Sequence, residues 1–475
     1  MTAAPRRRPR RLQRSLVLAA NRLPVQRDLL RHRWEISPGG LVTALSSITE
    51  QHDVAWVGWP GERSRRLEPF ELKDKLLVPV RLDPAELEAY YDGFCNATLW
   101  PLLHDLPVRP QYHRHWWDPY RAVNERFAVE IARVAAAKAV VWVHDYHLML
   151  VPRMLREMRP DLRIGFFLHV PFPGPELFLQ VPWRTQLLEG VCGADLVGLQ
   201  TEPDALNFEE SAVLSGAVRR SASGIRVGRR RVEVGAFPIS VDTASIEAQA
   251  DRPEIAEQAA RLRADLGSPK TVLLGIDRLD YTKGISVRLW ALQELLEAGA
   301  LSGPEDVVFV QVAVPSRERL GSYSEERRRI ANSVSDLNGR FGRIGQPVVH
   351  YLTRNLGFDE LLGLYRAADV MLVTPLKDGM NLVAKEYVAA SLHGRGVLVL
   401  SEFAGAAHEL HEAVIVNPYD VEGVKQALMA AVEMPEQERA RRMTAMRRRV
   451  ERADVHAWSG EFMARLGGAA SPASR

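Results

Sequence analysis

Residues 271–298 read TVLLGIDRLDYTKGISVRLWALQELLEA, a short aliphatic run joined to a longer amphipathic one by a charged loop. Residues 271–276 show little polar alternation, which is typical of a parallel strand buried on both faces. Residues 284–298 carry apolar side chains at the spacing of a helix. The segment therefore predicts one strand–loop–helix unit.

The same alternation extends over about 400 residues. Further aliphatic runs predict buried strands at 16–20, 54–57, 139–143, 164–169, 196–199, 232–236, 307–312, 348–351, 370–373, 397–400 and 413–416. Helical patterns include 123–136, 184–190, 254–266 and 358–367. Strands that alternate with helices predict an α/β fold with doubly wound parallel sheets.

The sequence FPISVD at residues 237–242 is the expected domain boundary. We predict two Rossmann-like domains, 15–240 and 241–455, that face each other across a central cleft. Ligands of such sheets bind beyond the carboxyl ends of the strands. Residues 1–14 are expected to be a disordered basic tail. Residues 456–475 are expected to form a helix that returns to the N-terminal domain, followed by a disordered tail.

Composition excludes several classes of protein. The chain has 475 residues, of which 46% are hydrophobic and 25% charged, an ordinary globular mixture that excludes disorder. The net charge is +3, but six arginines fall within the first 14 residues, and the remaining chain has 56 basic against 59 acidic residues. That balance argues against a nucleic-acid-binding protein, although the tail alone could contact an anionic partner. No apolar run is long enough to cross a membrane, and two cysteines suggest a cytoplasmic protein.

Two loops of the second half carry candidate ligand-binding residues. Arg278 and Lys283 follow the strand 271–276, where two fixed cations could hold a diphosphate. In the sequence KDGMNLVAKE at 377–386, Asp378 could bind sugar hydroxyls and Glu386 a ribose diol. The alternatives are a surface salt-bridge loop for the cations, and a helix cap with a solvated glutamate for the carboxylates.

Polar residues also follow strands of the first half. Asp145 and His169 each come at the end of a predicted strand, so both should point to the same rim of the sheet. Gly40 opens a predicted helix at 41–50, where backbone N–H groups could approach a phosphate with Arg22 nearby. A structural histidine and an ordinary turn are the alternatives.

Aromatic residues with polar neighbours are the third candidate group. Trp59, Tyr91 and Trp100 could line a sugar subsite, and core packing is the alternative. The chain contains no Asp-x-Asp pair, no Gly-x-Gly-x-x-Gly after a predicted strand and no P-loop. These absences argue against a diphosphate-bound metal ion, a dehydrogenase and a P-loop kinase.

Together these segments resemble the trehalose-6-phosphate synthase family, retaining glycosyltransferases of the GT-B fold, in its actinobacterial form. The resemblance runs from about residue 16 to 458. It rests on the motifs NRLP (21–24), PGGLV (38–42), FCNATLWP (94–101), WVHDYH (142–147), GFFLHVPFP (165–173), DRLDYTKG (277–284), TPLKDGMNLVAKE (374–386) and SEFAGA (401–406).

The resemblance implies a role for each candidate residue. The acceptor, glucose 6-phosphate, is expected to contact Arg22, Tyr91, Trp100, Asp145 and Arg317. The nucleotide-sugar donor is expected to contact Gly40, His169, Arg278, Lys283, Asp378, Gly379, Met380, Asn381, Leu382, Val383 and Glu386. Among these, Asp145, His169, Arg278 and Lys283 are expected to act in catalysis. No metal or other cofactor is implied.

The implied reaction makes α,α-trehalose 6-phosphate from UDP-glucose or GDP-glucose, with retention of configuration. The loop at 351–359 lies where the family reads the base, so the preferred nucleotide stays open, as does assembly into a homo-oligomer. Two other functions remain as alternatives. One is a pseudo-glycosyltransferase of the validoxylamine type, and the other is a non-catalytic sugar-phosphate sensor.

Overall fold

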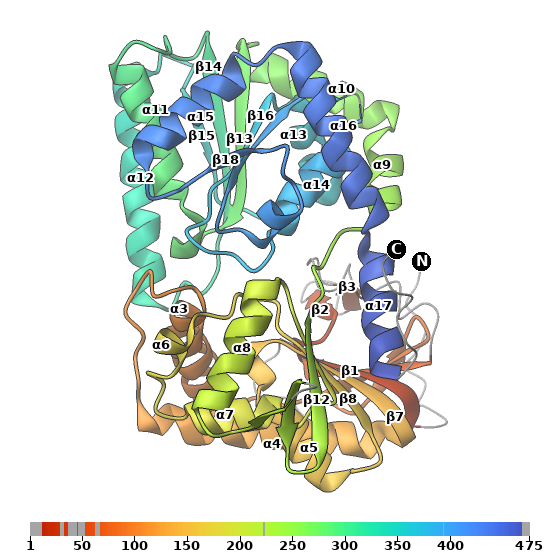
Figure 1. Ribbon diagram of the computed structural model, residues 1–475. Coiled ribbons are helices and arrows are strands. Elements are labelled where there is room, and N and C mark those ends of the chain that lie inside the picture. The colour runs from red at the N-terminus through yellow and green to blue at the C-terminus, as the bar shows by residue number, and fades with distance from the viewer. Residues whose placement is uncertain are drawn as a thin grey trace. The chain divides into compact units, whose positions relative to one another are not determined.

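The computed structural model describes residues 12–28, 33–36, 45, 53–61, 67–221, 224–392 and 394–467. The chain divides into two compact units. The N-terminal unit comprises Met1–Pro238 and His456–Arg475, and the C-terminal unit comprises Ile239–Val455. Both units are built on largely parallel sheets (Figure 1).

The N-terminal unit contains a sheet in the order β10-β11-β12-β9-β8-β7-β1-β4-β6-β5. All pairs from β12 to β6 in this order are parallel, and the pairs at the two edges are antiparallel. Its strands are β1 (Arg14–Arg22), β4 (Val54–Trp59), β5 (Phe70–Leu72), β6 (Lys75–Pro79), β7 (Ala135–His144), β8 (Arg163–Phe167), β9 (Leu196–Leu199), β10 (Arg219–Ser221), β11 (Gly224–Val227) and β12 (Arg230–Ala236). A separate hairpin joins β2 (Val25–Asp28) to β3 (Arg33–Ile36).

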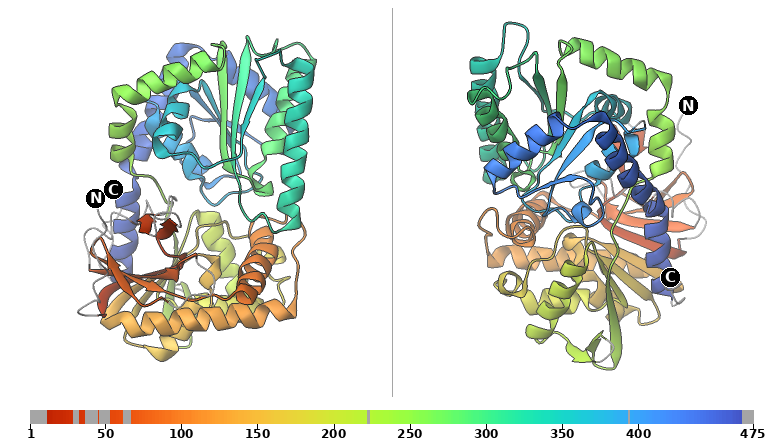
Figure 2. Two further views of the ribbon diagram at one scale, coloured as in Figure 1. Left: turned by 180° about the vertical axis from the view of Figure 1, so that it is seen from behind. Right: turned by 45° about the horizontal axis from the view of Figure 1, so that its top comes forward.

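Helices cover this sheet in both views of Figure 2. They are α2 (Pro84–Glu86), the π-helix η1 (Leu87–Leu99), α3 (Trp100–Leu103), α4 (Arg114–Val134), the short η2 (Tyr146–Leu148), α5 (Val151–Met158), α6 (Pro175–Phe178), α7 (Arg184–Val191) and α8 (Glu202–Leu214). The last helix of the chain, α17 (Val455–Gly467), also packs here. Phe462 stacks on Trp142 with ring centroids 4.3 Å apart, and a Cβ added at Gly198 would lie 2.7 Å from Phe462.

The C-terminal unit contains a wholly parallel sheet in the order β15-β14-β13-β16-β17-β18. Its strands are β13 (Thr271–Arg278), β14 (Val307–Val314), β15 (Val349–Leu352), β16 (Val370–Val373), β17 (Val397–Ser401) and β18 (Val414–Val416). Its helices are α9 (Thr243–Ala250), α10 (Pro253–Asp265), η3 (Tyr281–Lys283), α11 (Ile285–Glu297), α12 (Gly321–Phe341), α13 (Phe358–Ala367), α14 (Leu382–Ala390), η4 (Gly405–His408), α15 (Val421–Val432) and α16 (Glu436–Arg452).

Each aliphatic run predicted as a strand overlaps a strand of the structure, although the runs 164–169, 348–351 and 413–416 extend beyond β8, β15 and β18. Two further boundaries were wrong. Arg14, expected in the disordered tail, begins β1, and its buried guanidinium pairs with Asp53 at 2.6 Å and Glu71 at 3.0 Å. The helix predicted at 123–136 starts at Arg114 and ends at Val134, because the next residues already belong to β7.

Other predictions fall outside the described residues. These include the helix at 41–50, apart from Leu45, and most of the tail at 1–14. Within the described part of the chain, no helix is both long and apolar enough to span a membrane.

Candidate active site

In the C-terminal unit, two loops that follow neighbouring parallel strands meet. β13 and β16 are adjacent, so the segments after them leave the sheet at the same edge. Lys283 Nζ lies 2.6 Å from Asp378 Oδ2, and their side chains are only 9% and 14% exposed. The structure thus joins two predicted ligand-binding residues that are 95 positions apart.

Asn381 connects Asp378 to a helix N-terminus. Its Nδ2 donates to Asp378 Oδ2 at 3.0 Å, while its Oδ1 accepts from Ala384 N at 3.2 Å and so caps α14. Asn381 takes the left-handed conformation with φ 73°, which asparagine tolerates better than most residues. Gly379 and Met380 are buried beside the cap, and Leu382 and Val383 form the first turn of α14.

The buried side chain of Arg288 connects the loop after β13 to the loop after β16. Arg288 on α11 donates to Asp277 Oδ2 at 2.7 Å, to Thr374 Oγ1 at 2.8 Å and to the Lys283 carbonyl at 2.7 Å. Gly284, with φ 62°, allows this approach, since a Cβ there would lie 2.1 Å from the Thr374 carbonyl. Sequence reasoning missed Arg288, although an arginine on the apolar face of the predicted helix was a signal.

Further cations surround Asp280. Arg317 Nη1 lies 3.0 Å from Asp280 Oδ2 and donates to Tyr323 Oη at 2.6 Å. Burial alone would raise the pKa of Asp280, but the charges of Arg317, Arg278 and Lys283 outweigh burial and lower it. Arg278 ends β13 as an exposed side chain, whereas the Arg317 side chain is only 5% exposed. Arg317, predicted to contact the acceptor, therefore lies beside Asp280, on which the charges of Arg278 and Lys283 also act.

Glu386 lies one turn inside α14. Tyr365 Oη donates to Glu386 Oε2 at 2.8 Å, and burial raises the pKa of Glu386 against the opposing effect of that hydrogen bond. The carboxylate is thus hydrogen-bonded rather than solvated.

In the N-terminal unit, Asp145 directly follows β7 in a strained conformation. Its φ of 77° and ψ of 165° lie in a region that is almost restricted to glycine, and such strain concentrates at functional sites. Asp145 Oδ1 accepts from His169 N at 3.3 Å, and Oδ2 lies 3.7 Å from His147 Nδ1. The two residues predicted to share a rim are therefore in contact.

Four buried polar side chains hold the loop that contains Asp145. From η1, Tyr90 Oη donates to the His147 carbonyl at 3.3 Å, and Asn96 Oδ1 accepts from Tyr146 Oη at 3.0 Å. From α4, Tyr120 and Asn124 bind the loop backbone. Tyr120 Oη donates to the Tyr146 carbonyl at 2.8 Å, and Asn124 Nδ2 donates to the His147 carbonyl at 3.1 Å. Tyr90 and Asn96 lie in the π-helix η1, whose spacing differs from that of an α-helix, and Tyr120 lies before the helix predicted at 123–136.

The other predicted acceptor residues of the N-terminal unit are Tyr91, Arg22 and Trp100. The Tyr91 ring stacks on His147 with centroids 5.8 Å apart, which brings Tyr91 to the Asp145 loop. Arg22 is exposed at the end of β1, 4.9 Å over the Trp59 ring. Trp100 is only 3% exposed and packs against His104, so it contributes to the core. Gly40 lies outside the described residues.

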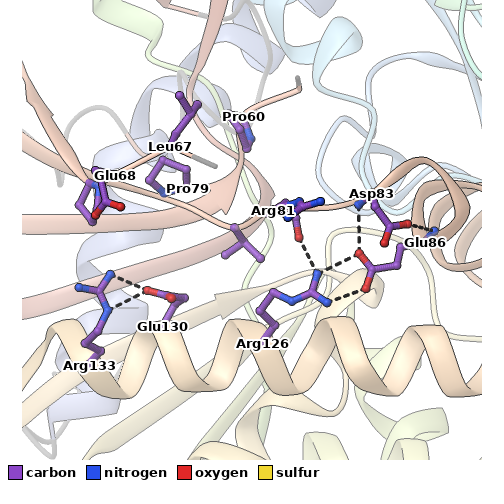
Figure 3. Close-up of a pocket in the computed structure, with 12 residues that line it drawn as sticks. Pro60, Leu67, Glu68, Pro79, Arg81, Asp83, Glu86, Arg126, Glu130 and Arg133 are labelled. Atoms are coloured by element: carbon purple, nitrogen blue, oxygen red, sulfur yellow. Dashed lines mark hydrogen bonds and ion pairs between the residues drawn. The ribbon is translucent and has the colours of Figure 1, made fainter. Parts of the chain in front are cut away.

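A cavity of about 590 Å³ in the N-terminal unit does not contain the predicted site residues (Figure 3). Arg126 of α4 donates to Glu86 of α2 at 3.0 Å, and Arg133 donates to Glu130 within α4 at 2.6 Å, so each of these charges has a partner in the cavity wall. Among the described residues, no group of three or more His, Cys, Asp or Glu side chains is placed to hold a metal ion.

Two α/β units on largely parallel sheets, with cations, carboxylates and a capped helix N-terminus where strands end, have the architecture of a GT-B glycosyltransferase. The family model of glycosyltransferase family 20 matches residues 14–467. The chain belongs to glycosyltransferase family 20 and is an enzyme of the kind that the resemblance to trehalose-6-phosphate synthases predicted.

Curated relatives are similar over nearly the whole chain. The chain is 52% identical over 465 residues to trehalose-6-phosphate synthase of Mycolicibacterium gilvum, covering 94% of this chain and 92% of the relative. It is 51% identical over 459 residues to the Mycolicibacterium smegmatis enzyme of the same name, covering 94% and 91%.

Solved structures are similar in fold. An α,α-trehalose-phosphate synthase (UDP-forming) from Burkholderia xenovorans, in complex with glucose-6-phosphate, aligns with a TM-score of 0.86 and 35% identity over 95% of this chain and all of that one. A structure from E. coli, bound with UDP-2-fluoro glucose, aligns with a TM-score of 0.86 and 36% identity over 95% and 98%. These matches confirm the predicted GT-B fold class.

Proposed function

We propose that this enzyme transfers glucose from a nucleotide diphosphate glucose to glucose 6-phosphate and releases α,α-trehalose 6-phosphate. The observation that carries the proposal is the contact between Lys283 and Asp378 at 2.6 Å. It unites a cation suited to a diphosphate with a carboxylate suited to sugar hydroxyls. The relatives' name, trehalose-6-phosphate synthase, supplies the product, and the similar Burkholderia structure in complex with glucose-6-phosphate supplies the acceptor.

Retention of configuration is part of the proposal. The bond between the sugar C1 and the diphosphate oxygen breaks, and C1 bonds to the anomeric oxygen of the acceptor on the same face. The proton of that acceptor hydroxyl passes to the leaving diphosphate oxygen. Arg278 and Lys283 stabilise the charge on that oxygen, and Asp378 holds the sugar, so the protein acts by positioning and electrostatics.

The N-terminal unit supplies the acceptor side of the proposed reaction. Arg22 and Tyr91 bind glucose 6-phosphate, while Asp145 orients its hydroxyls through the strained conformation at the end of β7. His169 contacts the donor sugar. In the C-terminal unit, Glu386 binds the ribose, and its hydrogen bond from Tyr365 orients the carboxylate.

The nucleobase of the nucleotide-sugar donor is a separate part of the proposal. The Burkholderia relative is called UDP-forming, and the E. coli structure was determined with a uridine nucleotide sugar. We therefore propose UDP-glucose as a donor, with GDP-glucose as its rival. A panel of UDP-, GDP- and ADP-glucose at equal concentration, with product measured by mass spectrometry, ranks the three.

Arg278→Ala tests the site. Removing one preorganised charge that stabilises a leaving group should lower kcat by about 100- to 1,000-fold. Arg261→Ala, on the exposed face of α10, is the matched control and should keep full activity with the same melting temperature. Near-normal turnover by folded Arg278→Ala would show that the diphosphate binds elsewhere.

The same assay separates the alternative functions. A pseudo-glycosyltransferase would turn over a nucleotide-linked cyclitol and leave every NDP-glucose intact. A sensor would bind glucose 6-phosphate in calorimetry and form no product over hours. Either outcome would overturn the proposed synthase function in favour of that alternative.

A further inference from the structure

Two histidines at the ends of β7 and β8 lie with their rings against each other. His144 Nδ1 is 3.1 Å from His169 Nε2, and the ring centroids are 5.3 Å apart with an interplanar angle of 29°. One hydrogen must lie between two nitrogens at this distance, since two N–H groups or two lone pairs would repel each other. The pair of neutral histidines therefore has two forms. In one form His144 donates the hydrogen bond, and in the other His169 donates it.

Neither ring carries a charge at neutral pH. Burial lowers the pKa of His169 to about 3, and burial together with the neighbouring His169 lowers that of His144 well below its ordinary value. Each imidazole consequently holds one N–H, and the hydrogen bond at one nitrogen decides what the other presents.

The surroundings of His144 discriminate between the two forms. His144 is fully buried, and its Nε2 has no hydrogen-bond partner in the described part of the chain. If His169 donated, the proton of His144 would reside on Nε2 without an acceptor. Buried N–H groups without an acceptor are rarer in proteins than buried acceptors without a donor. The arrangement favours donation by His144 from Nδ1.

We propose that His144 is a positioning residue that donates from Nδ1 to His169 Nε2 and so fixes the proton of His169 on Nδ1. His169 then presents an N–H donor to its ligand and does not act as a base. No described residue accepts a hydrogen bond from His169 Nδ1, so this nitrogen is available to a ligand. The identity of that ligand, the donor sugar, rests on the proposed function, whereas the tautomer does not.

The consequence for the proposed reaction is specific. A fixed N–H donor can bind a sugar oxygen and stabilise developing negative charge, but it cannot remove the acceptor proton. His169 is then not the base, which is consistent with the diphosphate oxygen as the proton acceptor of the same-face mechanism. His144 acts only through His169.

Histidine-selective 15N NMR of the full chain without substrates tests the tautomer. We expect the His169 signals to show a protonated Nδ1 and an unprotonated Nε2, with assignment by their loss in His169→Asn. His144→Asn, whose amide can donate from the position of Nδ1, should preserve this tautomer. His144→Leu should shift the His169 signals, while His411→Asn, at an exposed histidine, should remove only its own signals.

Kinetics provide the second measurement. His144→Leu should lower kcat/KM by about 10- to 100-fold, as loss of a histidine-orienting partner does elsewhere, and His144→Asn should recover most of it. If His144→Leu does not fold, His144→Gln replaces it, since its amide nitrogen takes the position of Nε2 rather than that of Nδ1.

Three outcomes are informative. A wild-type His169 protonated on Nε2 overturns the inference, as does a His144→Leu enzyme with unchanged His169 signals and unchanged turnover. The predicted tautomer in a protein that turns over no nucleotide sugar supports the inference and refutes the proposed function.

Discussion

The loops after β7 and β13 both present polar side chains at a strand end, but different chemistry holds them. The β7 loop, which carries Asp145, is fixed by neutral groups such as Tyr120 and Asn124. The β13 loop, which carries Lys283, is fixed by the buried ion pair of Arg288 and Asp277. A neutral network can hold a strained carboxylate without adding charge, whereas an anion-binding loop needs cations whose own charge is balanced by nearby carboxylates.

This difference implies different sensitivities. A buried charge that loses its partner costs more than a neutral group that loses one, because an ion is harder to desolvate. Substitution of a buried charged residue that holds the β13 loop should therefore lower the free energy of unfolding more than substitution of a neutral residue that holds the β7 loop.

The largest effect is expected for Arg288→Met. The substitution leaves Asp277 buried without its cation, which should lower the free energy of unfolding by about 3–5 kcal/mol. Urea unfolding measures this. Adding Asp277→Leu should restore most of the stability but not the turnover, since the Lys283 carbonyl still loses its donor. A single variant as stable as the wild type would contradict the ionic account.

As the pH falls, the N-terminal unit should lose stability at a higher pH than the C-terminal unit does. Because burial lowers the pKa of His169 to about 3, the unfolded chain takes up a proton there below its ordinary pKa of about 6.5 while the folded chain does not. Stability should thus fall from about pH 6.5 towards 3. Asp280 has a lowered pKa, so its contribution is present above its ordinary value of 3.8 and is lost only at more acidic pH.

Urea midpoints of wild type and His169→Asn between pH 7 and 5 check this prediction. The variant should lose less stability over this range. Equal losses would mean that the histidine titrates normally in the folded protein.

A smaller effect is expected for Asn124→Leu. It leaves the His147 carbonyl without this donor and Leu150 N without its acceptor, which should cost about 1–3 kcal/mol. Turnover should fall as Asp145 loses its support. Asn332→Ala, exposed on α12, is the control and should alter neither quantity.

The smallest effect is expected for Arg153→Ala. This arginine is 49% exposed and pairs with the exposed Glu157 at 3.1 Å and with Glu189, whose side chain is 35% exposed. Exposed ion pairs contribute less than about 1 kcal/mol. A melting temperature within about 1 °C of the wild type would agree with this prediction. A loss of stability as large as that of Arg288→Met would contradict the expected difference between buried and exposed ion pairs.

Much of the fold followed from local pattern. The aliphatic runs predicted their strands because a parallel strand buried on both faces must be apolar along its whole length. The candidate residues Lys283, Asp378, Asp145 and His169 followed from a second rule, since ligands bind where such strands end. The π-helix η1 escaped prediction because its side chains do not follow α-helical spacing. The start of α4 escaped because Pro119 lies inside this helix, and proline usually marks a helix boundary.

The sequence by itself determined the α/β class, the strand positions and the loops that carry the candidate ligand-binding side chains, because these depend on short-range periodicity. Tertiary structure decided which side chains meet. Arg288 with the Lys283 carbonyl, Asn124 with the His147 carbonyl and His144 with His169 are contacts between separate elements. Such contacts arise only when the sheet brings strand ends together and burial requires each polar group to find a partner.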